Sequence, residues 1–293
     1  MSEDDIRVDV DEALLSTFTT EGQFTRLAVD LLVEAGSFVA IAASATDSSG
    51  VWGREQATAG GNIVRLYKLI HAVLDQTCQR RGEIAMIMAR LCFETIVNIR
   101  YLAKHLSPEL MRSYISYSLR YERRLSDLVT SNIADRGGVV LPIEDRMQKS
   151  IKRTCAAAGI KLEEIDTRAQ RNWGGKNILE KATDLGLEEI HFVVFGGGNH
   201  SVHGNWPELY GNHLEWDGKD SFKPQTEWQT PRPQMLFLLA VLATDAVDDF
   251  LHFLNVSGGA REAWPDLVDL RQRIALANSP HEAYLQTKTW PEI

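Results

Sequence analysis

Residues 83–106 read EIAMIMARLCFETIVNIRYLAKHL and predict the strongest helix of the chain. At 100° per residue, five polar side chains of this segment fall within a sector of roughly 80°, and Arg100 and Lys104 near its end lie outside that sector. This polar stripe consists of Arg90, Glu94, Asn98, Tyr101 and His105. Apolar side chains fill nearly all of the remaining circumference, so the helix should be buried.

The polar stripe has two interpretations. A buried Arg90 and Glu94 need hydrogen-bonded partners, whereas an exposed i, i+4 pair contributes only about 0.2–0.5 kcal/mol. The stripe therefore faces either solvent or a polar pocket inside a helical bundle.

Apolar residues recur at helical spacing on both sides of this segment. Ser107 and Pro108 form a start signal for a helix to about residue 133. A long loop is expected over residues 205–233, which carry Trp, Pro and Gly without a period. The fold class is all-α, a helical bundle with a long irregular loop before the C-terminal helix pair. Further helices are predicted over residues 24–42, 62–81, 177–185, 233–255 and 260–277. Residues 146–158 and 162–170 are expected to form shorter helices or ordered loop.

The domain organisation follows from this pattern. An acidic N-terminal tail is expected over residues 1–20 and a single helical domain over residues 21–280, with its core at 60–256. Residues 281–293 form a C-terminal tail.

Composition narrows the class of protein. The 293 residues carry a net charge of -9, which argues against broad, phosphate-driven nucleic-acid binding. Cys78 and Cys92 fall on helical patterns and are expected to be buried thiols, and the chain has no C-x-x-C pair. The start MSEDDIRVDVDE lacks a signal peptide, and no apolar run reaches the ~20 residues of a membrane span. A cytoplasmic protein without a membrane helix is expected.

Four of the eight histidines lie close together, at His191, His200, His203 and His213. The segment 195–204 reads FGGGNHSVHG. If Asn199 caps a helix, His200 and His203 point the same way from its first turn. The glycines, Gly198 among them, then leave backbone N–H groups free to hold an anion.

This histidine segment is compatible with several kinds of chemistry. A histidine near neutral pKa acts as a general acid or base. A metal site would use His200 and His203 with Glu94 or His191, but no H-E-x-x-H signature is present. A nucleotide-phosphate loop would need a glycine pattern that is absent here. A purely structural interpretation ends a helix at the glycines. No cofactor and no metal are expected.

Two segments together resemble a known family. ARLCFETIVNIRYL at 89–102 and GGNHSVHG at 197–204 resemble domain of unknown function 5677, a bacterial family with an Arg-x-x-x-Glu helix and a later short signature ending in His-Gly. The resemblance spans roughly residues 60–204. Asn199 stands where the family more often has serine.

That family is in turn similar to the HEPN class of helical bundles, many of which are ribonucleases or phage-defence components that act as dimers. The resemblance implies a metal-independent endoribonuclease. These enzymes place an arginine four to six residues before the histidine, whereas here Gly197 and Gly198 precede His203. Arg90 from the neighbouring helix would then supply the cation.

Two functional hypotheses follow. In the first, a defence or stress protein acts on RNA or a nucleotide as a homodimer. His203 works there with Glu94 and Arg90, and the proposed site also includes Asn199, His200, Asn98, Tyr101 and Gly198. In the second, the same polar residues form a buried network in a non-catalytic protein-interaction module.

Overall fold

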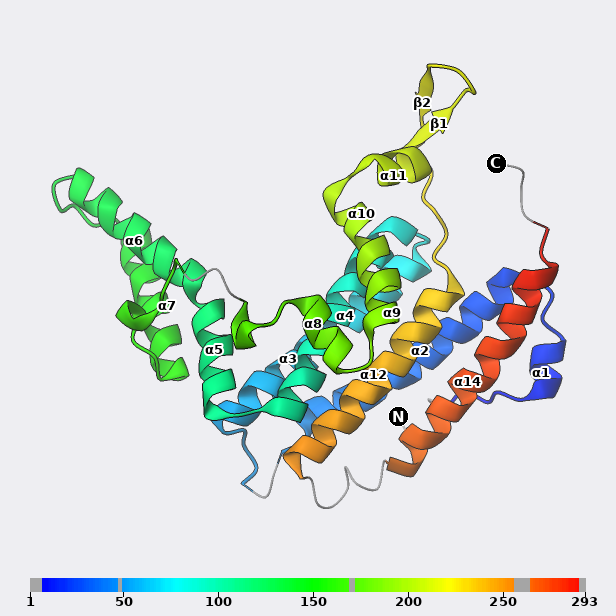
Figure 1. Cartoon of the computed structure of the whole chain (residues 1–293), viewed down its shortest axis with the longest axis horizontal. Helices are drawn as coiled ribbons and strands as arrows, with labels where there is room; N and C mark the ends of the chain where they lie inside the picture. The colour runs from blue at the N-terminus through cyan, green and yellow to red at the C-terminus, as the bar shows by residue number, and fades with distance from the viewer. Residues whose placement is uncertain (1–6, 47–48, 169–171, 256–263, 290–293) are drawn as a thin grey trace. The chain divides into compact units, whose positions relative to one another are not determined.

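The computed structural model describes residues 7–46, 49–168, 172–255 and 264–289, and the protein is helical (Figure 1). The chain divides into two compact units. The larger unit comprises residues 1–104 and 182–293, and the smaller unit comprises residues 105–181. The sequence predicted a single domain over residues 21–280.

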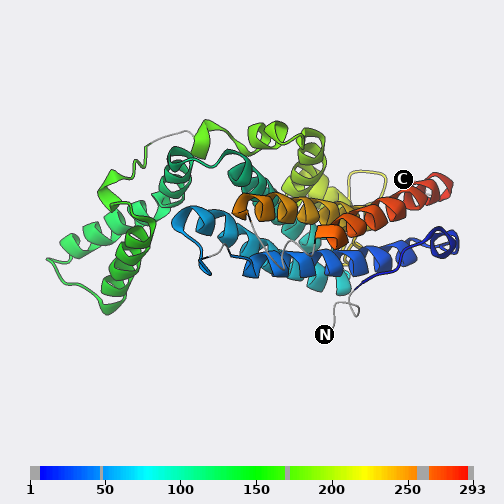
Figure 2. The same ribbon diagram turned by 90° about the horizontal axis from the view of Figure 1, so that it is seen from below.

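Long helices build the larger unit. Helix α12 (Pro233–Leu254) packs along α2 (Glu21–Ser44), and α2 also contacts α3 (Arg54–Cys78) and α14 (Trp264–Thr287). Figure 2 shows α2 and α12 running alongside each other. The short α1 (Glu12–Ser16) contacts α14. Helix α14 passes through Pro280 and continues to Thr287, so residues 281–287 of the expected tail are helical.

The core of this unit is formed by apolar faces at helical spacing. On α2, Leu31, Leu32 and Ala35 are completely buried. By length and composition alone α2 is apolar enough to cross a membrane, but half of the relevant window is buried inside the protein. Its contacts with α12, α3 and α14 are those of the core helix of a folded domain.

Helix α4 (Gly82–His105) matches the predicted central helix. Many of its apolar residues are buried, with Ala89, Phe93 and Ile96 completely inaccessible. Several others in its first half are only half-buried: Ile84, Met86, Ile87, Met88 and Leu91. Ser107 then caps α5 (Pro108–Ser118), because its side chain accepts a hydrogen bond from the Leu110 amide at 3.1 Å. The single helix predicted to about residue 133 is wrong, since the chain breaks at Leu119 and α6 (Arg120–Asp135) follows.

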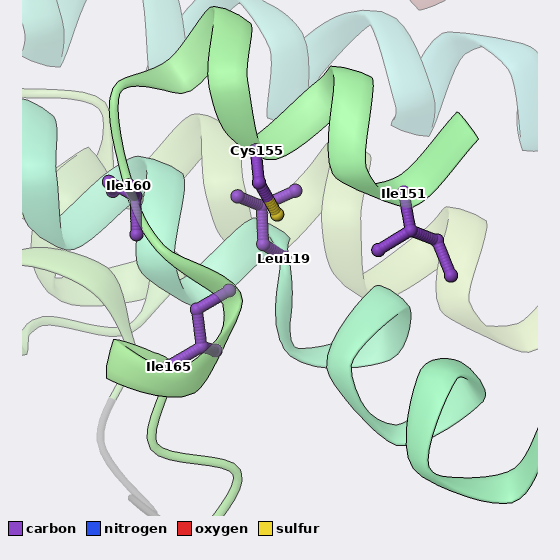
Figure 3. Packing of buried hydrophobic residues seen from close by; sticks show 5 residues of the cluster. All are labelled: Leu119, Ile151, Cys155, Ile160 and Ile165. Carbon is purple, nitrogen blue, oxygen red and sulfur yellow. The ribbon is translucent and has the colours of Figure 1, made fainter. Parts of the chain in front are cut away.

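The smaller unit has a core of its own. Helices α5 and α6 are followed by α7 (Pro142–Ala158), η2 (Leu162–Glu164) and η3 (Trp173–Gly175). Figure 3 shows this core, in which Cys155 of α7 lies against Leu119 at the junction of α5 and α6. Buried apolar side chains make up the cluster: Leu119, Ile151, Cys155, Ile160 and Ile165.

Residues 162–170 were expected to form a short helix or an ordered loop. Helical geometry covers Leu162–Glu164, the chain is non-helical over 165–168, and residues 169–170 lie outside the described residues. The next helix, α8 (Ile178–Asp184), agrees with the prediction for residues 177–185.

The segment before α12 is more ordered than predicted. Helical turns α9 (Glu188–Ile190), η4 (His191–Gly196) and α10 (Gly197–His203) run on without interruption. Residues 205–233, expected to be one irregular loop, hold α11 (Trp206–Glu208), η5 (Leu209–His213) and the antiparallel strands β1 (Leu214–Trp216) and β2 (Phe222–Pro224). Both η4 and η5 are π-helical.

The two cysteines predicted to be buried differ in their exposure to solvent. Cys92 in α4 is buried, whereas Cys78 is exposed at the last residue of α3. The expectation for Cys78 is therefore wrong, because the helix ends there and the side chain leaves the packed face.

Candidate functional site

The polar stripe of α4 is neither wholly exposed nor wholly buried. Arg90, Glu94 and Asn98 are half-buried, Tyr101 is buried, and His105 at the end of the helix is exposed. No ion pair joins Arg90 to Glu94 in the part of the chain that the structure describes.

Arg90 meets the glycine-histidine segment directly. Its guanidinium carbon lies 4.2 Å from the centroid of the Phe195 ring. A Cβ atom built on Gly198 would lie 2.9 Å from the Cβ of Arg90 and 3.3 Å from the Met86 carbonyl oxygen. Only glycine lets α10 approach α4 this closely. The structure therefore brings together Gly198 and Arg90, two residues of the proposed site.

The arginine is only partly satisfied. Its Nε atom is buried without a hydrogen-bond partner, although the guanidinium gains a favourable contact with the negative face of the Phe195 ring. Phe195 was not predicted as a site residue. The sequence signal that could have identified Phe195 is its position directly before three glycines.

Of the four clustered histidines, His191 is the one that packs against neighbouring side chains. Its ring stacks on Phe195 with centroids 4.7 Å apart and lies 6.1 Å from Phe93. Its Nε2 is buried without a partner, and burial lowers the pKa of His191. The imidazole is therefore neutral at pH 7.

His200 and His203 do not share the packed environment of His191. Both are exposed on α10, and His200 Nδ1 lies 2.5 Å from Asn205 Nδ2. In the described residues no hydrogen bond or ion pair joins Glu94 to His203. The predicted role of Glu94, to orient His203, is therefore supported by no contact in the described residues.

Helix α10 also corrects the expected roles of the glycines. It begins at Gly197, so Asn199 lies within the helix and is not its N-cap. The side chain of Asn199 lies outside the described residues. The three glycines do not end a helix, because α10 continues to His203 and is followed by Gly204, which has a φ of 56°. Gly198 serves close packing on α4 rather than a free anion-binding turn.

A buried carboxylate beyond α10 escaped the sequence analysis. Glu208 is 6% exposed, and its Oε2 accepts a hydrogen bond from the Ser201 hydroxyl at 2.9 Å. His213 Nε2 lies 3.6 Å from the other carboxylate oxygen. The spacing of Ser201 and Glu208 gave no signal, because the break between α10 and α11 at Gly204 and Asn205 separates them.

A cavity of about 780 Å³ lies beside these residues within the larger unit. Its walls come from the first turns of α2 and α4, from η4 and α10, and from residues 229–238 with Lys288. The Gly82 amide donates to the Gln229 carbonyl oxygen at 2.7 Å, and the Gln229 amide donates to the Glu83 carboxylate at 3.3 Å. A side chain on Gly82 would overlap Gln229.

The lining of this cavity is mixed. Apolar side chains, including Met86, Val194 and Leu238, lie beside the polar Ser201 and Gln234. The Oε1 atom of Gln234 is buried and has no hydrogen-bond partner.

The charged residues that line the cavity include two carboxylates that already have partners and an arginine at the start of α12. Lys288 pairs with Glu21, and Glu83 accepts from the Gln229 amide. Arg232 lines the cavity at the start of α12. Among the described residues there is no group of three His, Cys, Asp or Glu side chains that would hold a metal ion.

Fold and site define a helical protein with a ligand-sized cavity between its long helices. A family model described as a family of unknown function, DUF5677, matches residues 56–221. The match covers more than half of the chain, and the chain belongs to this family. It includes α4 and α10, whereas α2 and α12 lie outside it. No curated protein and no solved structure matches the chain.

Proposed function

We propose that the cavity binds a nucleotide, with adenine the favoured base. The observation that carries this proposal is a cavity of about 780 Å³ lined by Gln234, a residue whose Oε1 is buried and has no hydrogen-bond partner. Cavities of several hundred Å³ that combine apolar walls with a few polar groups are typical of small-molecule sites. A buried acceptor without a partner costs about 1–3 kcal/mol, and a ligand donor removes that cost.

The walls fit a nucleobase. Met86, Val194 and Leu238 supply apolar surface for the faces of a planar ring. A side-chain amide pairs edge-on with adenine, because its oxygen accepts from the exocyclic amine and its NH2 group donates to a ring nitrogen. Gln234 Oε1 therefore suits a base that carries an exocyclic amine.

The start of α12 fits the phosphate. Arg232 is the N-cap residue and makes no side-chain cap hydrogen bond, and Pro233 is the first helical residue. The backbone N–H groups of a first helical turn together with an arginine favour an anion. The two carboxylates of the cavity, Glu21 and Glu83, are engaged with Lys288 and the Gln229 amide.

The test is calorimetric titration with adenosine monophosphate, adenosine and inosine monophosphate. We expect adenosine monophosphate to bind about tenfold or more tightly than the other two, which lack the phosphate or the amine respectively. Arg232→Ala should remove the preference over adenosine, and Arg26→Ala on the exposed face of α2 should leave it intact.

A second variant separates binding from folding. Gln234→Leu removes the unpartnered oxygen, so we expect the free energy of unfolding to rise by about 1 kcal/mol while nucleotide affinity falls. Equal affinity for the three ligands, or no saturable binding, would overturn the proposal.

RNA cleavage is a second candidate, favoured by one observation. His200 and His203 are exposed within one turn of α10, as two imidazoles acting as acid and base require. The HEPN-like relation, a role in defence and a homodimeric state are proposals that go with this candidate. Cleavage in the presence of a chelator should be lost in His203→Ala and kept in His252→Ala, another exposed histidine. Cleavage unchanged in His203→Ala would reject this residue.

The non-catalytic module is the remaining alternative. It is supported by the packing of Arg90 on Phe195 and Gly198, which accounts for the arginine without a substrate. It predicts that no nucleotide or RNA changes the thermal midpoint of unfolding.

A further inference from the structure

A second concave surface lies on α11, η5 and the β-hairpin. Its volume is about 440 Å³. Four aromatic side chains line it together with Lys219 and Asp220: Trp206, Tyr210, Trp216 and Phe222. Their exposed fractions are 57, 41, 50 and 41% respectively. Single exposed aromatic residues are common, but a cluster of this kind marks a binding surface. We call it the aromatic pocket.

The rings contact one another in defined geometries. Trp206 and Phe222 meet edge to face with centroids 5.6 Å apart, and Trp206 and Tyr210 lie 6.2 Å apart at 26°. Strand pairing sets Trp216 opposite Phe222. The pocket is thus bounded by ring faces in more than one orientation.

Side-chain hydrogen bonds within the hairpin hold this arrangement in the absence of a ligand. The Trp216 indole N–H donates to the Lys219 carbonyl oxygen. Asp217 Oδ1 accepts from the Lys219 amide at 3.0 Å and its Oδ2 accepts from the Ser221 hydroxyl. These bonds order the hairpin turn, so little conformational entropy remains to be lost on binding.

The surrounding charge selects the sign of the ligand. Between residues 205 and 228 the chain carries five acidic residues and two lysines. Ring faces are negative as well, because the aromatic quadrupole concentrates electron density there. A phosphate is disfavoured at such a surface and a cation is attracted.

We propose that the aromatic pocket binds a trimethylammonium group. Such a group has no N–H to donate in a hydrogen bond and is weakly hydrated, and several aromatic faces together stabilise its positive charge. Asp220 on the rim adds a carboxylate for the same charge. The pocket shares no residue with the cavity lined by Gln234, so this inference stands or falls independently of nucleotide binding.

The first test compares choline with 3,3-dimethylbutan-1-ol, the neutral molecule in which carbon replaces the quaternary nitrogen. Binding to the full-length protein is followed by NMR titration of the indole N–H signals. We expect saturable binding of choline and at least about tenfold weaker binding of the neutral alcohol. Equal binding of the two, or none of choline, overturns the proposal.

Substitutions locate the site. Trp216→Ala and Phe222→Ala should each weaken choline binding by about 3- to 30-fold. Trp228→Ala is the matched control, because Trp228 is 51% exposed but lies outside the aromatic pocket. Circular dichroism and thermal unfolding establish that each variant is folded. An equal loss in Trp228→Ala would contradict the assignment.

Charge variants test the sign of the ligand without altering any ring. Asp220→Asn should weaken choline binding, whereas Lys219→Met should strengthen it. The opposite pattern, together with binding of adenosine monophosphate to the hairpin, would make the pocket a base-stacking surface and refute the cationic ligand.

The source of the trimethylammonium group is distinguished by three probes. The same trimethylammonium group is carried by phosphatidylcholine vesicles, by a peptide with trimethyllysine and by free choline. Binding of vesicles in the wild type and not in Trp216→Ala assigns a lipid, preferential binding of the peptide assigns a modified protein, and choline alone assigns a soluble metabolite.

Discussion

The guanidinium carbon of Arg90 lies 4.2 Å from the ring centroid of Phe195 and so connects the central helix α4 to the π-helical turn η4. The positive charge of Arg90 therefore lies over the face of the Phe195 ring and not in an ion pair with Glu94.

The first prediction concerns the stability that this contact provides, which replacement of the Phe195 ring should reveal. We expect Phe195→Leu to lower the free energy of unfolding by about 1–3 kcal/mol. In a double-mutant cycle with Arg90→Met, urea unfolding should give a coupling energy of about 0.5–2 kcal/mol. Additive effects of the two substitutions would disprove the contact.

A second prediction concerns two helical glycines. Gly198→Ala should destabilise the protein by about 1–3 kcal/mol, because the new Cβ would lie 2.9 Å from the Cβ of Arg90. Gly61→Ala is the matched control within α3, where no atom lies within 4 Å of the new Cβ. It should stabilise the protein by about 0.5–1 kcal/mol. Thermal unfolding distinguishes the two, and a stabilising Gly198→Ala would show that α10 does not need this close approach.

The ion pair between Glu34 and Arg273 gives a third prediction. Both residues are nearly inaccessible, at 5 and 6% exposure, and the pair joins α2 to α14 at 2.7 Å between Nη1 and Oε2. Arg273→Met should cost about 3–5 kcal/mol, because it leaves a buried carboxylate unpaired. The double variant Glu34→Leu with Arg273→Met should recover most of that loss.

Lys149→Met serves as the control for this pair. Lys149 pairs with Asp145 on the surface of α7, and exposed pairs of this kind contribute about 0–1 kcal/mol. A loss in Arg273→Met no larger than in the control would mean that the buried pair is not formed.

The smaller unit offers a prediction about pH. Lys181 is 2% exposed, its Nζ lies 3.7 Å from the centroid of the Trp173 ring, and it donates to the Lys176 carbonyl oxygen at 2.6 Å. Burial lowers the pKa of Lys181 from 10.5 to about 8. The unfolded chain therefore binds more protons than the folded one between these values, so stability rises with pH across this window.

This pH dependence has a specific control. The contribution of Lys181 to the free energy of unfolding should increase by about 1–2 kcal/mol between about pH 8 and about pH 9.5. Lys181→Met should abolish that increase, and Lys161→Met, at an exposed position, should retain it. Chemical denaturation at the two pH values measures it, and an identical rise in all three proteins would assign the effect to other groups.

Thiol reactivity supplies a fifth prediction. Cys78 is exposed, whereas Cys92 and Cys155 are buried. Burial raises the pKa of Cys92 to about 12 and also raises the pKa of Cys155. Only thiolates react with Ellman's reagent at an appreciable rate. One of the three thiols should therefore react quickly in the native protein, and Cys78→Ser should abolish that fast phase while leaving the total after denaturation at two.

The long helices could be predicted from the sequence because their signals are local. The apolar circumference of α4 and the Ser107 cap of α5 depend on residues within a few turns of each other. The glycine segment was misread, since glycine is a poor helix former in isolation. Packing of Gly198 on Arg90 outweighs that preference.

The candidate site was less accessible to sequence reasoning. Its cavity depends on contacts between distant parts of the chain, such as the Gln229 amide on the Glu83 carboxylate, 146 residues apart. The spacing of residues along the sequence does not predict a contact between positions so far apart. Ser201 and Glu208 likewise meet across the break at Gly204 and Asn205 between α10 and α11, which no helical period describes.

The π-helical turn η4 precedes α10 directly. A π-helical turn contains one residue more than an α-helical turn, so deletion of one residue from 191–196 would restore regular winding. Each residue advances a helix by about 100°, and α10 would then rotate by that angle about its own axis. Length variation in this short stretch would thereby redirect both imidazoles of α10 while leaving their identities untouched.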